Sequence, residues 1–196
     1  MYTGLTGVCN TSYTGAAMSD FRFGLGHVTL DFLATLGGRA GSRIERLAVP
    51  RDLSRWIAGA GMAAAPCASS ELLDDARALR EAIRRVLDCA REGGRPGASD
   101  LRLVNEWARR PVAAPQIGPD LARVSVGPDP VTGALAHIAR ESVEFVTGPE
   151  LARVRTCAGC TLLFIDRSRP GTRRWCSMER CGNRNKTAHY RQKRRH

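Results

Sequence analysis

The stretch Cys157-Ala-Gly-Cys160 decides, together with Cys176 and Cys181, how the end of this 196-residue chain folds. Its spacing is C-x2-C-x15-C-x4-C, which matches the ligand spacing of a tetrahedral four-cysteine zinc site. Four unrelated core cysteines are the alternative, but core cysteines are usually isolated among apolar neighbours. Here the flanks are small, basic or polar: Ala158-Gly159, Arg174-Trp175 and Gly182-Asn183. We therefore predict that the four cysteines bind one Zn²⁺, which is structural because four thiolates leave no coordination position open.

The positive charge of the chain gathers in the same region. Residues 151–196 hold 13 Lys and Arg against 2 Asp and Glu, whereas residues 1–150 hold 17 of each. The formal net charge of +11 therefore lies on the tail, a distribution typical of polyanion binding. A helix that is merely solvated by its charges is the alternative.

We expect a helix from Met178 to about Arg195, which would carry most of these charges. The predicted nucleic-acid contacts lie on this helix and on the hairpin before it: Arg173, Arg174, Asn183, Arg184, Lys186, Tyr190, Arg191, Lys193, Arg194 and Arg195. Arginine and lysine can bind phosphates, and asparagine can pair with adenine edges in a major groove.

The part of the chain before residue 149 is predicted to be mainly helical. Apolar residues recur three and four apart in five stretches: 28–36, 53–57, 72–90, 101–107 and 135–146. Pro50 and Pro130 suit first turns of helices, and Ser69 and Ser99 are candidate N-caps. Two short runs on either side of Gly118-Pro119-Asp120 predict a β-hairpin.

The predicted fold class is α+β. It consists of a mainly helical N-terminal domain with a small β-hairpin and a C-terminal four-cysteine zinc finger of treble-clef-like arrangement. Gly148-Pro149 is the expected boundary, so the predicted divisions are a disordered leader over 1–19, a ligand-sensing or dimerisation domain over 20–148, and the finger over 149–196.

The composition also bears on the compartment of the protein. No run of eighteen apolar residues occurs, so no membrane span is predicted, and the first seventeen residues lack the features of a secretory signal. A thiolate metal site indicates a reducing compartment, and we predict a cytoplasmic protein.

Catalytic motifs are absent from the sequence. There is no nucleophile elbow, no Walker loop and no dinucleotide-binding fingerprint, so we predict that the protein is not an enzyme. His27, Asp31 and Trp56 are candidates for a small-molecule pocket in the N-terminal part. The alternative, which we favour, is a local hydrogen bond between His27 and Asp31, because they lie one helical turn apart.

Two motifs resemble a known family. Cys181-Gly182-Asn183-Arg184, placed after the first cysteine pair, resembles the CGNR zinc finger, and Leu30-Asp31-Phe32-Leu33-Ala34-Thr35 is similar to the L-D-F-V-N-T motif of the ABATE domain that precedes that finger. Pro50-Arg51-Asp52-Leu53 and Trp56 look like the next helix of that domain. The resemblance covers roughly residues 21–196 and departs from the family at Ala34, where the usual residue is Asn.

The resemblance implies a stress-linked transcription regulator that binds DNA. Together with the charge distribution it predicts a regulator whose zinc finger binds double-stranded DNA and whose N-terminal domain senses a small molecule or mediates dimerisation. The alternative is an RNA-associated or protein-interaction zinc module. Because one small module covers only about 600–1,000 Å² of interface, we expect a homodimer.

Overall fold

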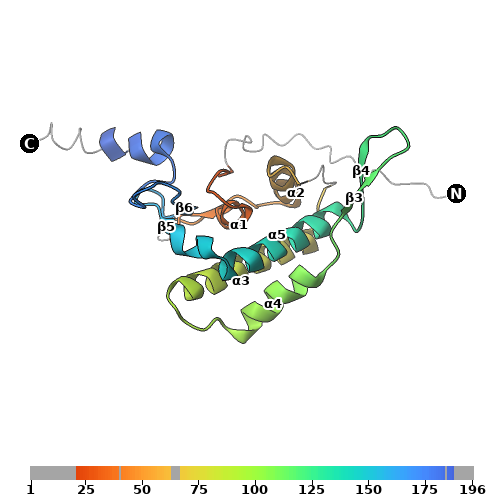
Figure 1. The fold of residues 1–196 in the computed structure, drawn as a ribbon, viewed down its shortest axis with the longest axis horizontal. Coiled ribbons are helices and arrows are strands. Elements are labelled where there is room, and N and C mark those ends of the chain that lie inside the picture. The colour runs from red at the N-terminus through yellow and green to blue at the C-terminus, as the bar shows by residue number, and fades with distance from the viewer. Residues whose placement is uncertain (1–20, 40, 63–66, 184, 188–196) are drawn as a thin grey trace, which may run out of the picture.

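The computed structural model describes residues 21–39, 41–62, 67–183 and 185–187 (Figure 1). The predicted leader, residues 1–19, lies outside the described residues. The α-helices are α1 (Val28–Leu33), α2 (Pro50–Gly59), α3 (Ser70–Arg91), α4 (Ala98–Arg109) and α5 (Pro130–Thr147). The strands form three antiparallel pairs: β1 (Leu36–Gly37) with β2 (Ile44–Glu45), β3 (Ala114–Ile117) with β4 (Arg123–Val126), and β5 (Val154–Thr156) with β6 (Leu163–Ile165). The predicted α+β class is confirmed.

Helices α3, α4 and α5 form the body of the molecule, with α3 and α5 side by side (Figure 1). Ser69 caps α3 as predicted, because its hydroxyl accepts a hydrogen bond from the backbone N–H of Leu72 (3.1 Å). Trp107 of α4 and Leu135 of α5 are at most 1% exposed and lie in the shared core. The body therefore follows the apolar periodicity of the sequence.

Two details of the helical prediction are wrong. Helix α4 begins one residue before Ser99, and its N-cap, Gly97, forms no side-chain cap bond. The first turn is held instead by Arg85, which donates two hydrogen bonds to the carboxylate of Asp100 (2.8 and 2.6 Å). Leu101 begins the apolar stretch 101–107, which predicts an inward position for it, but it is 39% exposed.

Helix α1 is also shorter than its apolar pattern suggests. It ends at Leu33, and Leu36–Gly37 form a strand that pairs with β2. The backbone leaves the helix because Arg46 donates its backbone N–H to the carbonyl of Thr35 (2.9 Å). A pairing partner eleven residues away thus overrides the local helical preference.

The β3–β4 hairpin is confirmed with the expected turn. Ala114 pairs with Val126 and Ile117 with Arg123, and Gly118 closes the turn by donating its N–H to the carbonyl of Ala122 (2.8 Å). The hairpin extends away from the helical body at the end opposite the finger (Figure 1).

The β5–β6 pair packs into the same core as the helices. Leu163, Phe164 and Ile165 are 3% exposed or less, and Ile165 donates its backbone N–H to the carbonyl of Leu25 (2.8 Å). Helix α5 is joined to this pair by a 3₁₀ turn, η2 (Pro149–Arg153). The division into two independent domains at Gly148 stays a prediction.

We expect Gly26→Ala to weaken the junction between the N-terminal segment and β6. Gly26 has φ +107°, and an added Cβ would lie 2.9 Å from Cβ of Ile165, so the substitution combines backbone strain with overpacking. We expect a loss of about 2–3 kcal/mol in the free energy of unfolding, measured by urea denaturation.

The matched control is Gly24→Ala. Gly24 also has a positive φ, +79°, but an added Cβ meets nothing within 4 Å. Gly24→Ala should lower the free energy of unfolding by about 1 kcal/mol, from backbone strain alone. Equal losses in the two variants would contradict a tight contact between Gly26 and β6.

None of the described helices has the length and apolar composition that a membrane crossing requires.

Candidate metal centre

The first cysteine pair lies on the loop that joins β5 to β6. Cys157 follows β5 directly, its N–H donates to the carbonyl of Leu162 (2.9 Å), and its carbonyl accepts from the N–H of Thr161 (2.9 Å). Thr161 has φ +61°, the left-handed conformation that turns the chain back toward β6. This tight loop brings the Cys160 sulfur back beside that of Cys157.

The second cysteine pair is brought in by residues 166–182. The Asp166 carboxylate organises this segment by accepting hydrogen bonds from the N–H and hydroxyl of Ser168 (2.9 and 2.6 Å) and from the N–H of Arg173 (2.8 Å). These bonds, with the Ser168 hydroxyl first, hold the pKa of Asp166 below its ordinary value. Residue 174 then returns to the first loop, where its carbonyl accepts the N–H of Ala158 (3.0 Å).

Cys181 is presented by a single π-helical turn, η3 (Met178–Gly182). Ser177 caps this turn by accepting the N–H of Arg180 (3.3 Å). The return segment 173–175 is not a strand, so the finger's strand pairing is β5 with β6, which flank the first cysteine loop. The treble-clef description of the finger stays a prediction.

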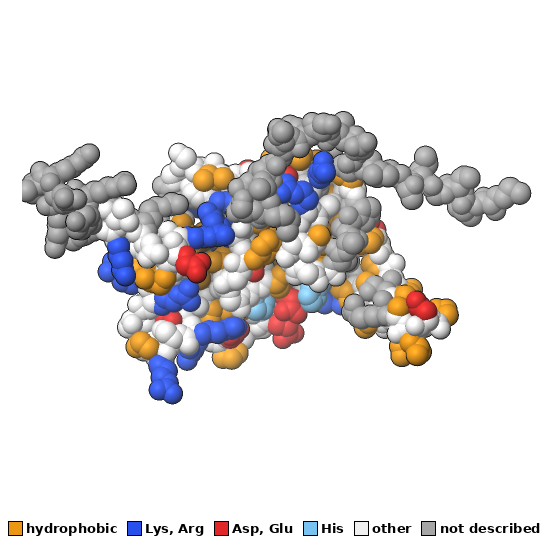
Figure 2. Space-filling model, turned by 90° about the horizontal axis from the view of Figure 1, so that it is seen from above, with side chains coloured by type: hydrophobic (Ala, Val, Ile, Leu, Met, Phe, Trp, Pro, Cys, Tyr) orange, Lys and Arg blue, Asp and Glu red, His pale blue; other side chains and the backbone are white. Residues whose placement is uncertain are grey.

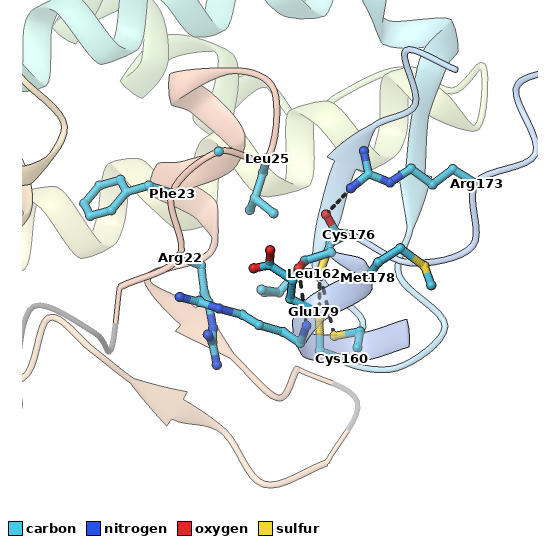
Figure 3. A pocket seen from close by; sticks show the side chains of 13 residues that line it. Arg22, Phe23, Leu25, Cys160, Leu162, Arg173, Cys176, Met178 and Glu179 are labelled. Atoms are coloured by element: carbon cyan, nitrogen blue, oxygen red, sulfur yellow. Dashed lines mark hydrogen bonds between the residues drawn. The ribbon is translucent and has the colours of Figure 1, made fainter. Parts of the chain in front are cut away.

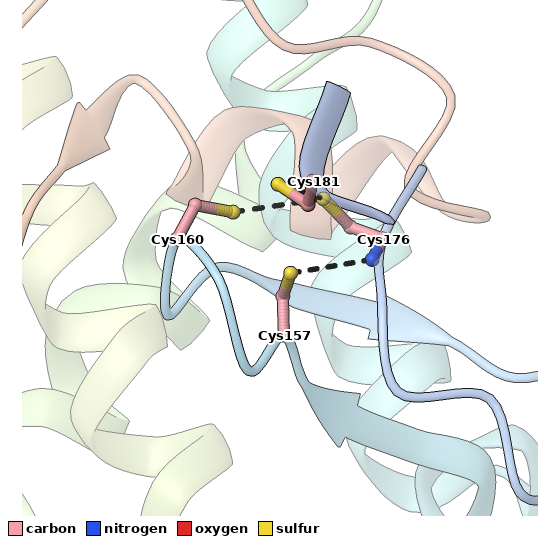
Figure 4. Close-up of side chains that lie close together, drawn as sticks. All are labelled: Cys157, Cys160, Cys176 and Cys181. Carbon is pink, nitrogen blue, oxygen red and sulfur yellow. Dashed lines mark hydrogen bonds between the residues drawn. The ribbon is translucent and has the colours of Figure 1, made fainter. Parts of the chain in front are cut away.

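The four sulfurs form a compact cluster (Figure 4). All lie within 4.8 Å of one another, with 3.6 Å between Cys160 and Cys176 and 3.8 Å between Cys176 and Cys181. A tetrahedron with metal–sulfur bonds of about 2.3 Å has sulfur–sulfur edges of about 3.8 Å. The cluster is therefore positioned to bind a metal ion, and its donor set fits structural Zn²⁺.

The electrostatics of the cluster favour a cation. A hydrogen bond from the Cys176 thiol lowers the pKa of Cys160 to about 5, and the same bond raises the pKa of Cys176. Burial, followed by the Cys160 thiolate, raises the pKa of Cys181 to about 11. Without a metal the thiols thus oppose one another's ionisation, and bound Zn²⁺ would allow all four to be thiolates.

Two glycines and a tryptophan close the centre. A Cβ on Gly159 would lie 3.2 Å from Cβ of Cys181, and one on Gly182 would lie 2.7 Å from the sulfur of Met178. Both positions also face Trp175 at 3.5 Å. A side chain at position 159 would therefore press on Cys181, and one at position 182 would displace the flexible end of Met178.

The predicted nucleic-acid residues divide into three groups. The guanidinium of Arg173 forms hydrogen bonds within the finger, donating to the carbonyls of Trp175 (2.8 Å) and Cys176 (2.5 Å). Arg174, Asn183 and Lys186 are exposed. The remaining predicted contacts lie outside the described residues: Arg184, Tyr190, Arg191, Lys193, Arg194 and Arg195. The expected helix to Arg195 is described only as far as residue 187.

A cavity of about 530 Å³ lies between the segment Arg22–Leu25 and the finger (Figure 3). Its walls include Arg22 and Arg180, which the sequence analysis did not single out. The charge of Arg180 could have been noted within the basic tail. Nothing local in the sequence places Arg22 beside a segment about 140 residues away.

The three residues proposed for a ligand pocket have separate surroundings. His27 caps α1 by accepting the N–H of Thr29 (3.2 Å) and stacks on Phe145 at 4.4 Å. Asp31 instead accepts the backbone N–H groups of residues 24 and 25 (3.1 and 2.8 Å). The expected local bond between His27 and Asp31 is therefore replaced by these two caps. Burial lowers the pKa of His27 and raises that of Asp31.

Trp56 is a core residue. It is fully buried and packs against the rings of Phe32 (5.2 Å) and Phe23 (6.1 Å). Its indole nitrogen has no hydrogen-bond partner among the described residues. Its role in packing accounts for an aromatic residue at this position without a ligand.

Comparison with protein families gives two matches. Residues 26–149 match the ABATE family, described as "putative stress-induced transcription regulator", and residues 153–194 match the CGNR zinc finger. No curated protein matches the chain. The first match ends at the first residue of η2 and the second begins at its last residue, and the second contains all four clustered cysteines.

Proposed function

This chain belongs to the ABATE family and ends in a CGNR zinc finger, and from this we propose that it is a transcription regulator whose finger binds double-stranded DNA. In this proposal Zn²⁺ is structural. Metal binding by four thiolates contributes on the order of 10–16 kcal/mol in isolated fingers, enough to hold a short segment in one conformation. The centre would thus fix the basic residues that follow it.

The observation that carries the proposal is how the arginines are paired. In the helical part, arginines face carboxylates, as in Arg39–Glu81 (2.7 Å), Arg80–Glu45 (2.6 Å) and Arg85–Asp100 (2.6 Å). In the finger, Arg167 pairs with Glu150 (2.8 Å), but among the described residues from 168 to 187 no arginine or lysine forms an ion pair with a carboxylate. Figure 2 shows Lys and Arg side chains gathered at the end of the molecule that carries the finger.

Unpaired cations on one surface favour a polyanion. A phosphate contact releases condensed counterions, whereas an arginine already paired with a carboxylate gains little from it. Asn183 is exposed directly after η3 and has the chemistry to read an adenine edge. We propose that Arg174 and Lys186 bind phosphates and that Asn183 lies near the bases, and that the basic residues from Arg184 to Arg195 contribute further contacts to DNA.

We expect the double variant Arg174→Ala, Lys186→Ala to weaken DNA binding while zinc content is unchanged. If each side chain neutralises one phosphate, the slope of log K against log salt should become less steep by about 1.8. The measurement is fluorescence anisotropy with a labelled duplex over a series of salt concentrations. Arg184→Ala and Arg191→Ala are tested in the same titration.

The matched control is Arg85→Ala, which removes an exposed arginine that is paired with Asp100. It should leave the affinity and the salt slope unchanged. If the double variant also leaves both unchanged, the finger surface is not the DNA interface. Competition between duplex DNA and structured RNA at fixed salt tests the second candidate function, an RNA-associated module, which preferential binding of RNA would favour.

The N-terminal domain, in the same proposal, senses a small molecule or mediates dimerisation. A homodimer is supported by the size argument, because one finger offers only about 600–1,000 Å² to DNA.

A further inference from the structure

The four cysteines of the metal centre differ in how deeply they are buried. Cys160 and Cys176 are half-buried and line the 530 Å³ cavity beside the finger, and the buried Cys181 lines it as well. Cys157 is 1% exposed, and its sulfur accepts the N–H of Cys176 (3.3 Å). A structural zinc site is usually inert because its thiolates are shielded, whereas two of the four cysteines here are only half-buried.

The cavity is large enough and suitably charged for reaction at the two half-buried cysteines. A peroxide molecule is little larger than water, so a volume of 530 Å³ admits it easily. Three arginines, Arg22, Arg173 and Arg180, and one carboxylate, Glu179, line the cavity. Their positive charge offsets the charge of −2 on a zinc centre with four thiolates and favours departure of a negatively charged leaving group.

Each of the two half-buried cysteines also has another cysteine sulfur close to its own. The Cys160 and Cys176 sulfurs lie 3.6 Å apart, whereas the Cys181 residue is 8% exposed and its sulfur is 3.8 Å from that of Cys176. A sulfenic acid formed on the sulfur of Cys160 or Cys176 would therefore lie within reach of the thiolate of the other cysteine. Cys160 and Cys176 are the pair that is both half-buried and close.

We propose that Cys160 and Cys176 are a site of reversible oxidation by hydroperoxides, and that formation of a disulfide between them releases the metal. One thiolate attacks the terminal oxygen of the hydroperoxide and the O–O bond breaks. Hydroxide leaves (alkoxide in the case of an alkyl hydroperoxide), and the sulfur becomes a sulfenic acid. The second thiolate attacks that sulfur, the S–S bond forms and a second hydroxide leaves. The two thiolates together lose two electrons and the peroxide gains them.

The disulfide removes two of the four metal ligands. Two thiolates do not hold Zn²⁺ at the affinity of four, so the ion leaves and the segment from Cys176 to Cys181 loses its link to the first loop. A thiol reductant reverses the step by exchange and restores both thiolates. If the proposed DNA binding is correct, oxidation would also release DNA, but the chemistry itself does not depend on that function.

The first experiment measures metal release and disulfide formation on the zinc-loaded full chain. A background with Cys9→Ser, Cys67→Ser and Cys89→Ser leaves only the four ligands. On addition of hydrogen peroxide we expect one equivalent of zinc to reach a chromogenic chelator for each equivalent of peroxide consumed. Peptide mapping by mass spectrometry should identify a Cys160–Cys176 disulfide, and dithiothreitol with added zinc should restore the metal. Retained zinc, or a disulfide that contains Cys157, would overturn the proposal.

A second experiment tests the cavity as the route. Glu179 is exposed and lines the cavity, so Glu179→Trp would narrow it without touching the core. Because thiolate reactivity depends on access, zinc release by peroxide should slow by about threefold or more. Glu92→Trp, at the exposed C-terminal end of α3, is the matched control and should react at the original rate. An unchanged rate in Glu179→Trp would refute entry through the cavity.

These results are distinguishable from failure of the proposed function. Zinc release and disulfide mapping require no DNA, so a chain that never binds DNA can still confirm the oxidation site. A chain that binds DNA but keeps its zinc in peroxide contradicts the oxidation site alone.

Discussion

Cys176→Ser is expected to abolish zinc binding and to unfold the part of the finger that follows β6. Cys176 is central to the cluster, because its sulfur lies 3.6 Å from that of Cys160 and 3.8 Å from that of Cys181. A hydroxyl does not replace a thiolate as a zinc ligand at neutral pH, so the metal contribution, on the order of 10–16 kcal/mol in isolated fingers, is largely lost.

The structure limits how far this unfolding should spread. Segment 173–182 contributes few buried side chains of its own, and it is tied to the first loop by the Ala158–Arg174 backbone bond and by the metal ligands. By contrast, Phe164 and Ile165 are buried in the helical core. We therefore expect β5 and β6 to remain folded when zinc is lost.

Metal analysis and hydrogen exchange test both statements. Zinc should fall from one equivalent to a small residue, and amide protection should disappear over 173–187 while it persists in α3, α5 and β6. Cys89→Ser is the matched control, because Cys89 lies on α3 outside the cluster and should leave zinc and protection intact. Unchanged zinc content in Cys176→Ser would remove this cysteine from the centre.

The sequence was sufficient for features that are encoded over short distances. The metal centre follows from the spacing of four cysteines, and the helices follow from apolar residues repeated every three or four positions. Ser69 and Pro130 mark helix starts correctly because a cap acts within its own turn. The β3–β4 hairpin was predictable for the same reason.

Features that depend on distant partners were missed. The cavity wall formed by Arg22 and the contact of Ile165 with Leu25 join segments about 140 residues apart, which no local pattern encodes. The end of α1 was misjudged because Thr35 pairs with Arg46. One signal was present and overlooked: Arg80 lies between Leu79 and Ile83 on the apolar face of α3, where an arginine requires a partner.

The partners of Arg80 are the carboxylates of Glu45 and Glu81, and they make Arg80 the second site where a single substitution should strongly lower stability. The side chain of Arg80 is 3% exposed, and its guanidinium donates two hydrogen bonds to Glu45 (2.7 and 2.6 Å), one to Glu81 (2.9 Å) and one to the hydroxyl of Thr35 (3.1 Å). The cluster attaches the β1–β2 pair to α3. Arg80→Ala would leave a half-buried carboxylate on Glu45 without its main cation, in addition to a cavity.

We expect Arg80→Ala to lower the free energy of unfolding by about 3 kcal/mol at pH 7, the low end for a buried pair because Glu45 is partly exposed. For a chain of this length that corresponds to a melting temperature about 10 °C lower. Arg84→Ala, one turn further along α3, is the matched control. Its partner Asp88 is 36% exposed, so the cost should be about 0.5 kcal/mol or less. Equal losses in the two variants would contradict a special role for the Arg80 cluster.

The pH dependence of the loss distinguishes a charge effect from a packing effect. Burial alone would raise the pKa of Glu81, but hydrogen bonds from Arg39 and Arg80 lower it to about 2, and the pKa of Glu45 is likewise lowered. The stability that these depressed pKa values supply is fully present above the ordinary glutamate pKa of about 4.5 and is lost as pH falls toward 2. In Arg80→Ala, burial without the guanidinium should raise the pKa of Glu45. At low pH, protonation of Glu45 therefore removes an unpaired charge from the variant, whereas in the wild type it removes a stabilising ion pair. The difference between the two proteins should therefore shrink between pH 5 and pH 3 in urea titrations. A difference that stays constant over this range would mean that Arg80 acts through its packed methylene groups rather than through its charge.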